Sequence, residues 1–276
     1  MSNIASKASQ FVVSKLPQKY AIKLIRAVSY VKSFIQYGDA TVFQQVFLEI
    51  NTGCNRSCWY CPEKFKRYSG DKMSRDVLQK CFDRLSEINY RGTVGFTIFN
   101  EALQDSRLEN IIRDLKISVP RCIPILFTNG DYLTPERAES LVQAGLVQAG
   151  LVRCTITRHP PSNEAWDKKI DSIIKKYPHV FRLNVVSNPI NVGGFISGIE
   201  FDPAVPCFSP TYALPIRFNG DVSPCCCDYY RTVILGNIMS ESLLEIWKKP
   251  DFIEKRKQLS KGIRPWLICQ KCSGVR

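Results

Sequence analysis

The chain has 276 residues, of which 45% are hydrophobic and 23% are charged, and its formal net charge is +13. This composition excludes a mainly disordered protein, and the length allows one large domain or one domain with a small appendage. The sequence contains no recognisable secretory signal and no stretch that approaches the length of a membrane span, so we expect a cytoplasmic protein.

Cysteine usage is high, with 12 cysteines that cluster at short spacings. Such clusters are more typical of metal sites than of a disulfide framework, which agrees with a reducing compartment. Both ends of the chain are basic: residues 1–40 contain six Lys and Arg against one acidic residue, and residues 245–276 contain nine against three. A polyanion would be attracted to such surfaces. No nucleic-acid-binding motif accompanies them, so we expect solvated basic faces and no nucleic-acid partner.

The first predicted segment, residues 1–40, contains a basic amphipathic helix over residues 15–37. Apolar side chains that include Val28, Val31 and Ile35 recur at helical spacing, with lysines and arginines elsewhere on the wheel. We expect the apolar stripe to pack on the rest of the protein. Peripheral contact with an anionic membrane is the alternative, which we do not favour.

The second predicted segment, residues 41–200, alternates short apolar strands with amphipathic helices. The expected strands lie in residues 46–50, 93–99, 124–127, 152–157 and 182–187, and the expected helices in residues 74–88, 107–116, 135–145 and 166–177. This alternation predicts an α/β fold with a parallel sheet, an open partial (β/α)6 barrel rather than a closed eight-stranded one. Active sites on such sheets gather at the carboxyl ends of the strands.

Three cysteines, Cys54, Cys58 and Cys61, directly follow the first predicted strand. Zinc in a structural site takes four ligands, so it would need a remote fourth one here. An iron-sulfur cubane held by three thiolates would instead leave one iron open to a substrate or cofactor. The spacing by itself leaves both metals open.

The CxxxCxxC pattern of this loop, here CNRSCWYC, resembles the radical S-adenosylmethionine (radical SAM) enzymes. In that family the open iron of a 4Fe-4S cluster is chelated by S-adenosylmethionine, whose reductive cleavage gives a 5′-deoxyadenosyl radical that abstracts hydrogen from the substrate. The resemblance implies that the chain is a radical SAM oxidoreductase and that Cys54, Cys58 and Cys61 hold its catalytic cluster.

The resemblance also implies five contacts with S-adenosylmethionine at strand ends: Tyr60 near the adenine, Glu101 at the methionyl ammonium, Asn129 in the pocket wall, Arg158 at the methionyl carboxylate and Ser187 at the ribose. Two glycines that precede the glutamate in the family are replaced here by Phe99 and Asn100. Each of the five side chains could instead cap a strand end.

The third predicted segment, residues 201–276, contains the second cysteine group: Cys207, Cys225, Cys269 and Cys272. An Asn219-Gly220 pair predicts a hairpin that delivers Cys225. Four cysteines describe a zinc ribbon as well as an iron-sulfur site.

The order of this group, with GxxxxC from Gly220 to Cys225 and a terminal CxxC, resembles the SPASM domain, or the shorter twitch extension, of radical SAM enzymes. Such tails bind auxiliary 4Fe-4S clusters. The resemblance implies one auxiliary cluster on the four cysteines, with Cys226 and Cys227 as candidates to replace Cys225. Three other cysteines, at positions 81, 122 and 154, are expected in the core.

The function implied is oxidation of an alcohol of a sugar or cyclitol, with S-adenosylmethionine and two 4Fe-4S clusters as cofactors and the auxiliary cluster as electron acceptor. The implied partners are a small-molecule or peptide substrate and an electron donor such as flavodoxin or ferredoxin. One alternative is a radical SAM maturase that modifies a ribosomally made peptide. Another, from a different class, is a non-catalytic metal-binding protein associated with RNA.

One departure concerns the glycine pair Gly193-Gly194, which resembles that of radical dehydrogenases with a single auxiliary cluster. An arginine precedes the pair in those enzymes and faces the substrate alcohol, whereas this chain has Asn191 and Val192. A valine cannot relay a proton. Either His159 or Arg158 takes over this role, or the substrate differs.

Overall fold

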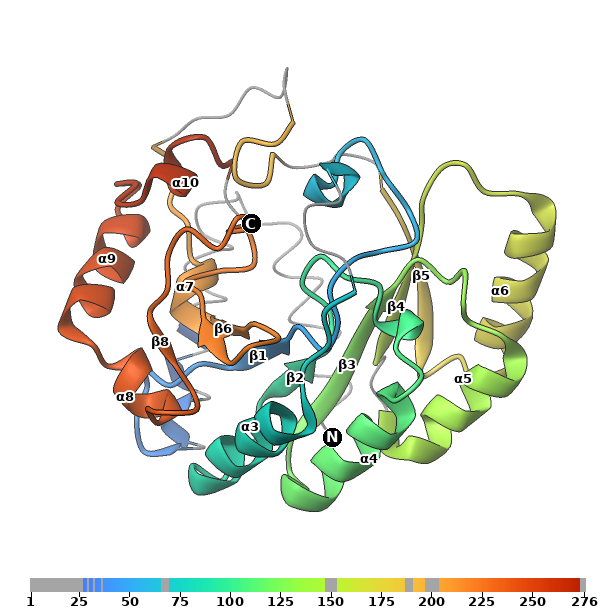
Figure 1. Ribbon diagram of the computed structural model, residues 1–276, viewed down its shortest axis with the longest axis horizontal. Helices are drawn as coiled ribbons and strands as arrows, with labels where there is room; N and C mark the ends of the chain where they lie inside the picture. The colour runs from blue at the N-terminus through green and yellow to red at the C-terminus, as the bar shows by residue number, and fades with distance from the viewer. Residues whose placement is uncertain are drawn as a thin grey trace.

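The computed structural model describes residues 27–28, 30–31, 33–35, 37–65, 70–146, 153–186, 191–196 and 204–273. These residues form an α/β fold around a sheet with the strand order β5-β4-β3-β2-β1-β6-β7-β8. The sheet runs through the middle of the molecule, with α3 to α6 along one side and the C-terminal helices gathered beyond β6 to β8 (Figure 1).

Five parallel strands confirm the five that the sequence predicts: β1 (Gln45–Leu48), β2 (Thr93–Gly95), β3 (Ile123–Thr128), β4 (Cys154–Arg158) and β5 (Phe181–Val185). The sixth parallel strand, β6 (Ala213–Ile216), pairs with β1 on the side opposite β2. The described strands therefore agree with a partial (β/α)6 barrel. Its sixth strand is supplied by the C-terminal segment.

Four amphipathic helices connect the parallel strands: α3 (Arg75–Glu87), α4 (Leu108–Ser118), α5 (Pro135–Leu141) and α6 (Glu164–Lys176). Three of them begin at polar residues, Ser74, Thr134 and Asn163, whose side chains accept a hydrogen bond from the first turn. Their apolar faces bury residues against the sheet, which fixes the strand ends where the site is built.

Helix α5 continues into a short π-helical turn, η3 (Val142–Leu146), at the start of the LVQAG repeat. Gly145 in this turn has φ of 109°, a conformation that glycine adopts without strain. The helix therefore ends at the first copy of the repeat, and most of the second copy lies outside the described residues.

The C-terminal segment adds a hairpin and four helices to the same sheet. Its elements are α7 (Ser209–Tyr212), β7 (Asp221–Val222), β8 (Gly236–Asn237), α8 (Leu243–Trp247), α9 (Pro250–Ser260) and α10 (Leu267–Gln270). The hairpin from β6 to β7 confirms the predicted turn, although only Gly220 of the pair is among the residues with positive φ. Helix α8 starts after Ser242, because Ser242 and Glu245 form a capping box there.

Trp247 of α8 fastens the C-terminal segment to the strand region. Its ring packs edge-on against Phe43 with centroids 5.3 Å apart, and its indole N–H donates to the Thr41 carbonyl at 2.6 Å. The residue is 1% exposed. The core is thus continuous across the predicted boundary between residues 200 and 201.

The N-terminal helix corrects one expectation. The described positions between residues 27 and 37 are helical, but Val28, Val31 and Ile35 are 56%, 59% and 77% exposed. Instead, Ser33 faces inward and donates to the Val42 carbonyl at 2.9 Å. For these three side chains the predicted packing is wrong. This part of the helix contacts the rest of the protein through the polar side chain of Ser33.

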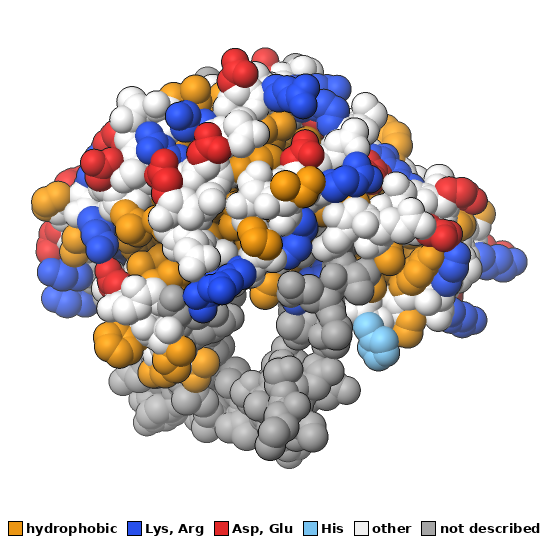
Figure 2. Space-filling view, turned by 90° about the horizontal axis from the view of Figure 1, so that it is seen from below, with side chains coloured by type: hydrophobic (Ala, Val, Ile, Leu, Met, Phe, Trp, Pro, Cys, Tyr) orange, Lys and Arg blue, Asp and Glu red, His pale blue; other side chains and the backbone are white. Residues whose placement is uncertain are grey.

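No helix of the described residues is both long and apolar enough to cross a membrane. On the face shown in Figure 2, Lys and Arg side chains are interspersed with Asp and Glu rather than gathered in one patch.

Candidate active site

The three cysteines of the loop after β1 face one cavity of about 540 Å³. The other walls come from the carboxyl ends of β2 to β5, as expected for a parallel sheet. Cys54, Cys58 and Cys61 are all partly exposed. A volume in this range suits a cofactor or small ligand.

Two amide groups lie within hydrogen-bonding reach of the Cys54 sulfur. The Arg56 backbone N–H is 3.4 Å from Sγ, and the Asn129 side-chain amide is 3.7 Å away. Donors of this kind favour the thiolate, which is the form that binds metal. Burial raises the pKa of Cys61 to about 12, so this thiol must release its proton when it binds iron.

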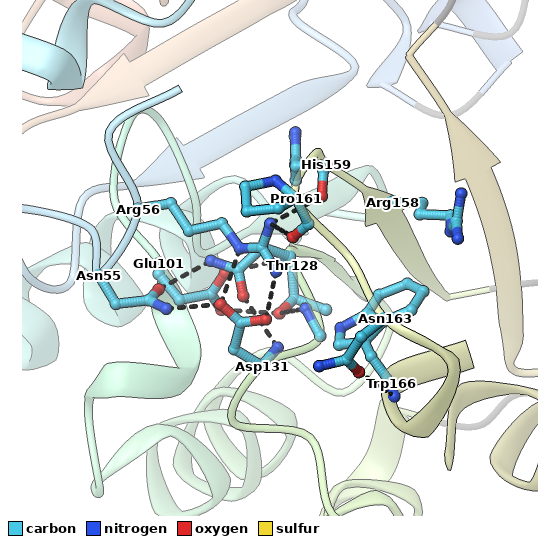
Figure 3. Close-up of polar contacts among 12 residues, drawn as sticks. Asn55, Arg56, Glu101, Thr128, Asp131, Arg158, His159, Pro161, Asn163 and Trp166 are labelled. Atoms are coloured by element: carbon cyan, nitrogen blue, oxygen red, sulfur yellow. Dashed lines mark hydrogen bonds and ion pairs between the residues drawn. The ribbon is translucent and has the colours of Figure 1, made fainter. Parts of the chain in front are cut away.

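Arg56 fixes the cysteine loop to the loops that follow β3 and β4. Its guanidinium makes a bidentate ion pair with Asp131 at 2.6 and 2.7 Å, and it also donates to the carbonyls of His159 and Pro161 at 2.8 and 3.2 Å. Asn55 donates to the same carboxylate at 2.6 Å. These side chains converge on one point in Figure 3.

We name the Arg56–Asp131 pair, with the two carbonyls it reaches, the loop clamp. Burial by itself would raise the pKa of Asp131, but the hydrogen bonds from Arg56 and Asn55 outweigh it and lower that pKa. The clamp was not predicted from the sequence. A signal was available, because Arg56 lies inside the cysteine motif and Asp131 directly follows the Thr128-Asn129-Gly130 stretch.

Glu101 lies in the cavity wall and is 2% exposed. Its carboxylate accepts hydrogen bonds from Leu103 N–H at 3.1 Å, from Thr128 Oγ1 at 2.7 Å and from Asn129 N–H at 2.8 Å. Burial raises the pKa of this carboxyl, while the hydrogen bonds act in the opposite direction. Since an ionised carboxylate has about four lone-pair sites, about one acceptor position remains for a ligand.

Gly130, which ends the same stretch, has φ of 76°. A Cβ at this position would lie 2.9 Å from an Ile156 side-chain carbon and 3.1 Å from the Trp166 ring. Only glycine both adopts this positive φ without strain and leaves room for the Ile156 and Trp166 side chains. Gly130 thereby keeps Asn129 in place at the cavity wall.

Tyr60 and His159 also line the cavity, and they contact each other. The Tyr60 hydroxyl is hydrogen-bonded with His159 Nδ1, and the rings stack with centroids 5.8 Å apart. Burial lowers the pKa of His159, and the nearby Arg56 lowers it further. The imidazole is therefore neutral near pH 7, where it can take up a proton.

The structure does not bring every predicted residue to the cavity. Arg158 is absent from its described lining and makes a bidentate ion pair with Asp167 of α6 at 2.6 and 2.7 Å. Figure 3 shows it apart from the residues that converge on Asp131. Side chains alternate along a strand, so Thr157 and His159 face the cavity while Arg158 does not. Ser187 lies outside the described residues.

The second cysteine group converges on a small cavity in the C-terminal segment. Five cysteines line it: the predicted Cys207, Cys225, Cys269 and Cys272, and also Cys227. Cys226 is not among the lining residues. The three cysteines that were expected in the core, at positions 81, 122 and 154, are each fully buried.

Val192 contacts both the larger cavity and the second cysteine group. It lines that cavity and also packs against Cys225, Cys227 and Cys272. Its neighbours Gly193 and Gly194 both have positive φ, at 61° and 86°, which explains the glycine pair that the sequence shows. One side chain thus contacts both the larger cavity and the second cysteine group.

Both donor sets fit iron-sulfur clusters, which are held by cysteine thiolates. The three cysteines of the first loop share a cavity of about 540 Å³ that leaves room for a further ligand. The second group supplies at least four thiols, and the cavity that they line is much smaller. Within the described ranges, no three His, Cys, Asp or Glu side chains converge as ligands of a single metal ion.

A three-cysteine loop after β1 of a partial barrel, combined with a cysteine-rich tail, is the arrangement of radical SAM enzymes that carry a SPASM-type domain. Residues 207–273 match the family described as an iron-sulfur cluster-binding domain, SPASM. The chain is 26% identical over 242 residues to the S-adenosyl-L-methionine-dependent 2-deoxy-scyllo-inosamine dehydrogenase of Niallia circulans, covering 85% of this chain and 94% of the relative.

Solved structures agree with this match. A crystal structure of BtrN in complex with AdoMet and 2-DOIA superposes with a TM-score of 0.77 at 26% identity, covering 85% of this chain and 94% of BtrN. A structure of anSMEcpe with bound AdoMet and a peptide has a TM-score of 0.58 at 14% identity, covering 83% of this chain and 90% of that one. The second match concerns the fold alone.

The predicted resemblance to radical SAM enzymes with a SPASM-type tail is confirmed, as are the α/β fold class and the class of enzyme. The predicted cofactors, S-adenosylmethionine and iron-sulfur clusters, are confirmed at the level of this class. The SPASM match lies inside the predicted segment 201–276. The segment boundaries and the roles of individual site residues stay predictions.

Proposed function

We propose that this chain is a radical SAM dehydrogenase that oxidises a secondary alcohol of a small cyclitol or sugar. The observation that carries the proposal is that Val192 lines the larger cavity and also packs against three cysteines of the second group. A substrate held in the larger cavity would then be close to both cysteine groups. The dehydrogenase relative supports the reaction type, and its name supports an aminocyclitol as the kind of substrate.

When bound, S-adenosylmethionine on the first cluster supplies the radical that removes the carbon-bound hydrogen atom, and the auxiliary cluster supplies an acceptor for the remaining electron. The hydroxyl proton is left for the protein to take up, which completes the balance of one hydrogen atom, one proton and one electron. Of the two candidates from the sequence, His159 lines the cavity and Arg158 does not. If Nδ1–H donates to Tyr60, Nε2 can accept the substrate proton.

The proposed contacts with the cofactors are made by residues that line the larger cavity. In this proposal Cys54, Cys58 and Cys61 hold the first cluster, Glu101 accepts a hydrogen bond from the methionyl ammonium, and Asn129 and Tyr60 line the pocket. Arg158 is not part of it, because its guanidinium is paired with Asp167. The auxiliary cluster is held by the predicted ligands of the tail.

The remaining partners are also proposals. Reduction of the first cluster requires a one-electron donor such as flavodoxin or ferredoxin, and the net charge of +13 would favour an acidic partner. A cytoplasmic location is proposed because free thiols that bind iron persist in reducing compartments.

The first test is cofactor cleavage. Protein reconstituted without oxygen should hold about eight iron and eight sulfide per chain, and with dithionite it should cleave S-adenosylmethionine to 5′-deoxyadenosine and methionine. Replacing Cys54, Cys58 and Cys61 together by Ala should remove about half of the iron and all cleavage. Stoichiometric zinc beside four iron in freshly purified protein would contradict the two-cluster proposal.

The second part of the test uses 2-deoxy-scyllo-inosamine as the substrate probe. The wild-type protein should give about one oxidised product per deoxyadenosine. Replacing Cys207 and Cys272 together by Ala should leave deoxyadenosine formation intact and lower the product sharply. Circular dichroism and cofactor affinity check that the double variant is folded. A wild-type product ratio in this variant would exclude the electron-acceptor role.

A further inference from the structure

The second cysteine group contains one thiol more than a cubane cluster needs. A 4Fe-4S cluster is held by four cysteines. Cys227 lines the same small cavity as the four predicted ligands, whereas its neighbour Cys226 does not. The residue is 4% exposed, compared with 8% for Cys225 and 6% for Cys272.

The Cys227 thiol lies between two of the predicted ligands. It is hydrogen-bonded with the thiols of both Cys225 and Cys272, and the three side chains form one buried cluster with Val192. Cys207 and Cys269 line the same cavity and form a separate buried cluster with Leu259. An iron bound by Cys225 would therefore lie close to the Cys227 thiol as well.

The backbone around Cys227 is firmly held. The Arg217 guanidinium is 1% exposed and donates to the Asp228 carbonyl at 2.6 Å. The Asp228 carboxylate is fully buried and accepts from Thr232 N–H at 3.0 Å and from Val233 N–H at 2.9 Å. The Cys227 carbonyl accepts from Tyr229 N–H at 3.0 Å. Because these bonds hold the main chain from the Cys227 carbonyl onward, side-chain rotation is the simplest way to move the thiol within the cavity.

We propose that Cys227 is a reserve ligand of the auxiliary cluster and binds iron in place of Cys225 when that thiolate is lost. The exchange is a ligand substitution in which one iron–sulfur bond breaks and another forms, while the incoming thiol gives up its proton and the outgoing sulfur takes one. No electron is transferred. This inference rests on the proposed function, because it assumes that the tail holds a cluster.

The experiment uses a background in which Cys54, Cys58 and Cys61 are all replaced by Ala, so that only the auxiliary cluster remains. Iron, sulfide and the electron paramagnetic resonance spectrum of the reduced cluster are measured after anaerobic reconstitution. The background should hold about four iron per chain. Adding C225A should leave about four, with a shifted spectrum because the ligand has changed.

The double change C225A/C227A should keep clearly less iron than C225A, and its spectrum should differ from that of C225A because one iron is left without a thiolate. Its matched control is C225A/C226A, which removes the same number of neighbouring thiols but leaves Cys227, and which should keep about four iron. Equal circular dichroism spectra of the two double variants, together with the same comparison for Ser in place of Ala, exclude misfolding as the cause of the loss.

Two results would overturn the reserve-ligand proposal alone: loss of the cluster in C225A, or equal loss in both double variants. Loss of the cluster with C227A while C225A keeps it with an unchanged spectrum would also overturn it, since Cys227 would then be the ordinary ligand. A background protein that binds no iron would overturn the auxiliary cluster itself, and the proposed function with it.

Discussion

His159 is the side chain that should give the reaction its pH dependence. Burial and Arg56 lower its pKa below the ordinary value of about 6.5, so it is neutral and able to accept a proton at pH 7. Val192, which precedes the glycine pair and lines the cavity, has no group that could accept a proton. In the proposed reaction the substrate proton therefore goes to the His159 imidazole, which the Tyr60 hydroxyl orients.

We predict that the oxidised product formed per deoxyadenosine stays level from pH 8 to 7 and falls as the pH drops through a pKa below about 6.5. The sign follows because protonated His159 cannot accept a further proton. The H159Q variant should lose product formation by about 10²- to 10⁴-fold across this range. R158Q is the matched control, because Arg158 faces away from the cavity, and its profile should match the wild type. An H159Q profile with the wild-type shape would exclude His159 as the base.

At the scale of the elements, three loops meet at the carboxyl ends of the strands and the loop clamp joins them. The ion pair is partly buried, with 16% and 25% of the Arg56 and Asp131 side chains exposed. The lowered pKa of Asp131 means that its contribution to stability is present above about pH 4 and is lost as the pH falls through the lower folded value. The clamp therefore holds the cysteine loop at neutral pH.

Replacing Asp131 by Ala should lower the free energy of unfolding by about 1–3 kcal/mol, because the Arg56 guanidinium loses its partner in a partly buried place. The loosened cysteine loop should also weaken the binding of S-adenosylmethionine to the reconstituted protein. Denaturant unfolding and equilibrium binding measure the two effects. E164A is the control: Glu164 pairs with Lys168 while 81% exposed, so its loss should cost less than about 1 kcal/mol. Equal effects in the two variants would show that the clamp is an ordinary surface ion pair.

At the scale of the whole molecule, the C-terminal segment completes the sheet as well as carrying cysteines. Strand β6 pairs with β1 over four residues, from Gln45 with Ala213 to Leu48 with Ile216. Without it, the backbone groups along that side of β1 would have no partner strand, and the contact between Phe43 and Trp247 would be lost. An unpaired apolar edge of this kind promotes aggregation.

A chain that ends at residue 200 should therefore aggregate or unfold, although it contains the complete radical SAM motif and five of the six parallel strands. Solubility, circular dichroism and size-exclusion chromatography measure this outcome. A chain that ends at residue 273 is the control and should behave as the full protein, since it keeps Cys272 and the Ser273 N–H bond to the Asn191 carbonyl. A soluble, folded 1–200 fragment would show that the two predicted segments are independent domains.

The sequence by itself determined the strands, most of the helices and both cysteine groups, because these depend on local patterns of apolar residues, caps and short spacings. Tertiary structure decided which of the matching residues share a cavity. The alternation of side chains along β4 turns His159 inward and Arg158 outward, and a one-residue difference in the assumed strand phase reverses that result. Other features depend on residues far apart in the chain, and such contacts leave no periodic signal in one sequence. They are the loop clamp, the side of β1 on which β6 pairs, the contact of Val192 with both the larger cavity and the second cysteine group, and the presence of Cys227 as a fifth thiol in that group.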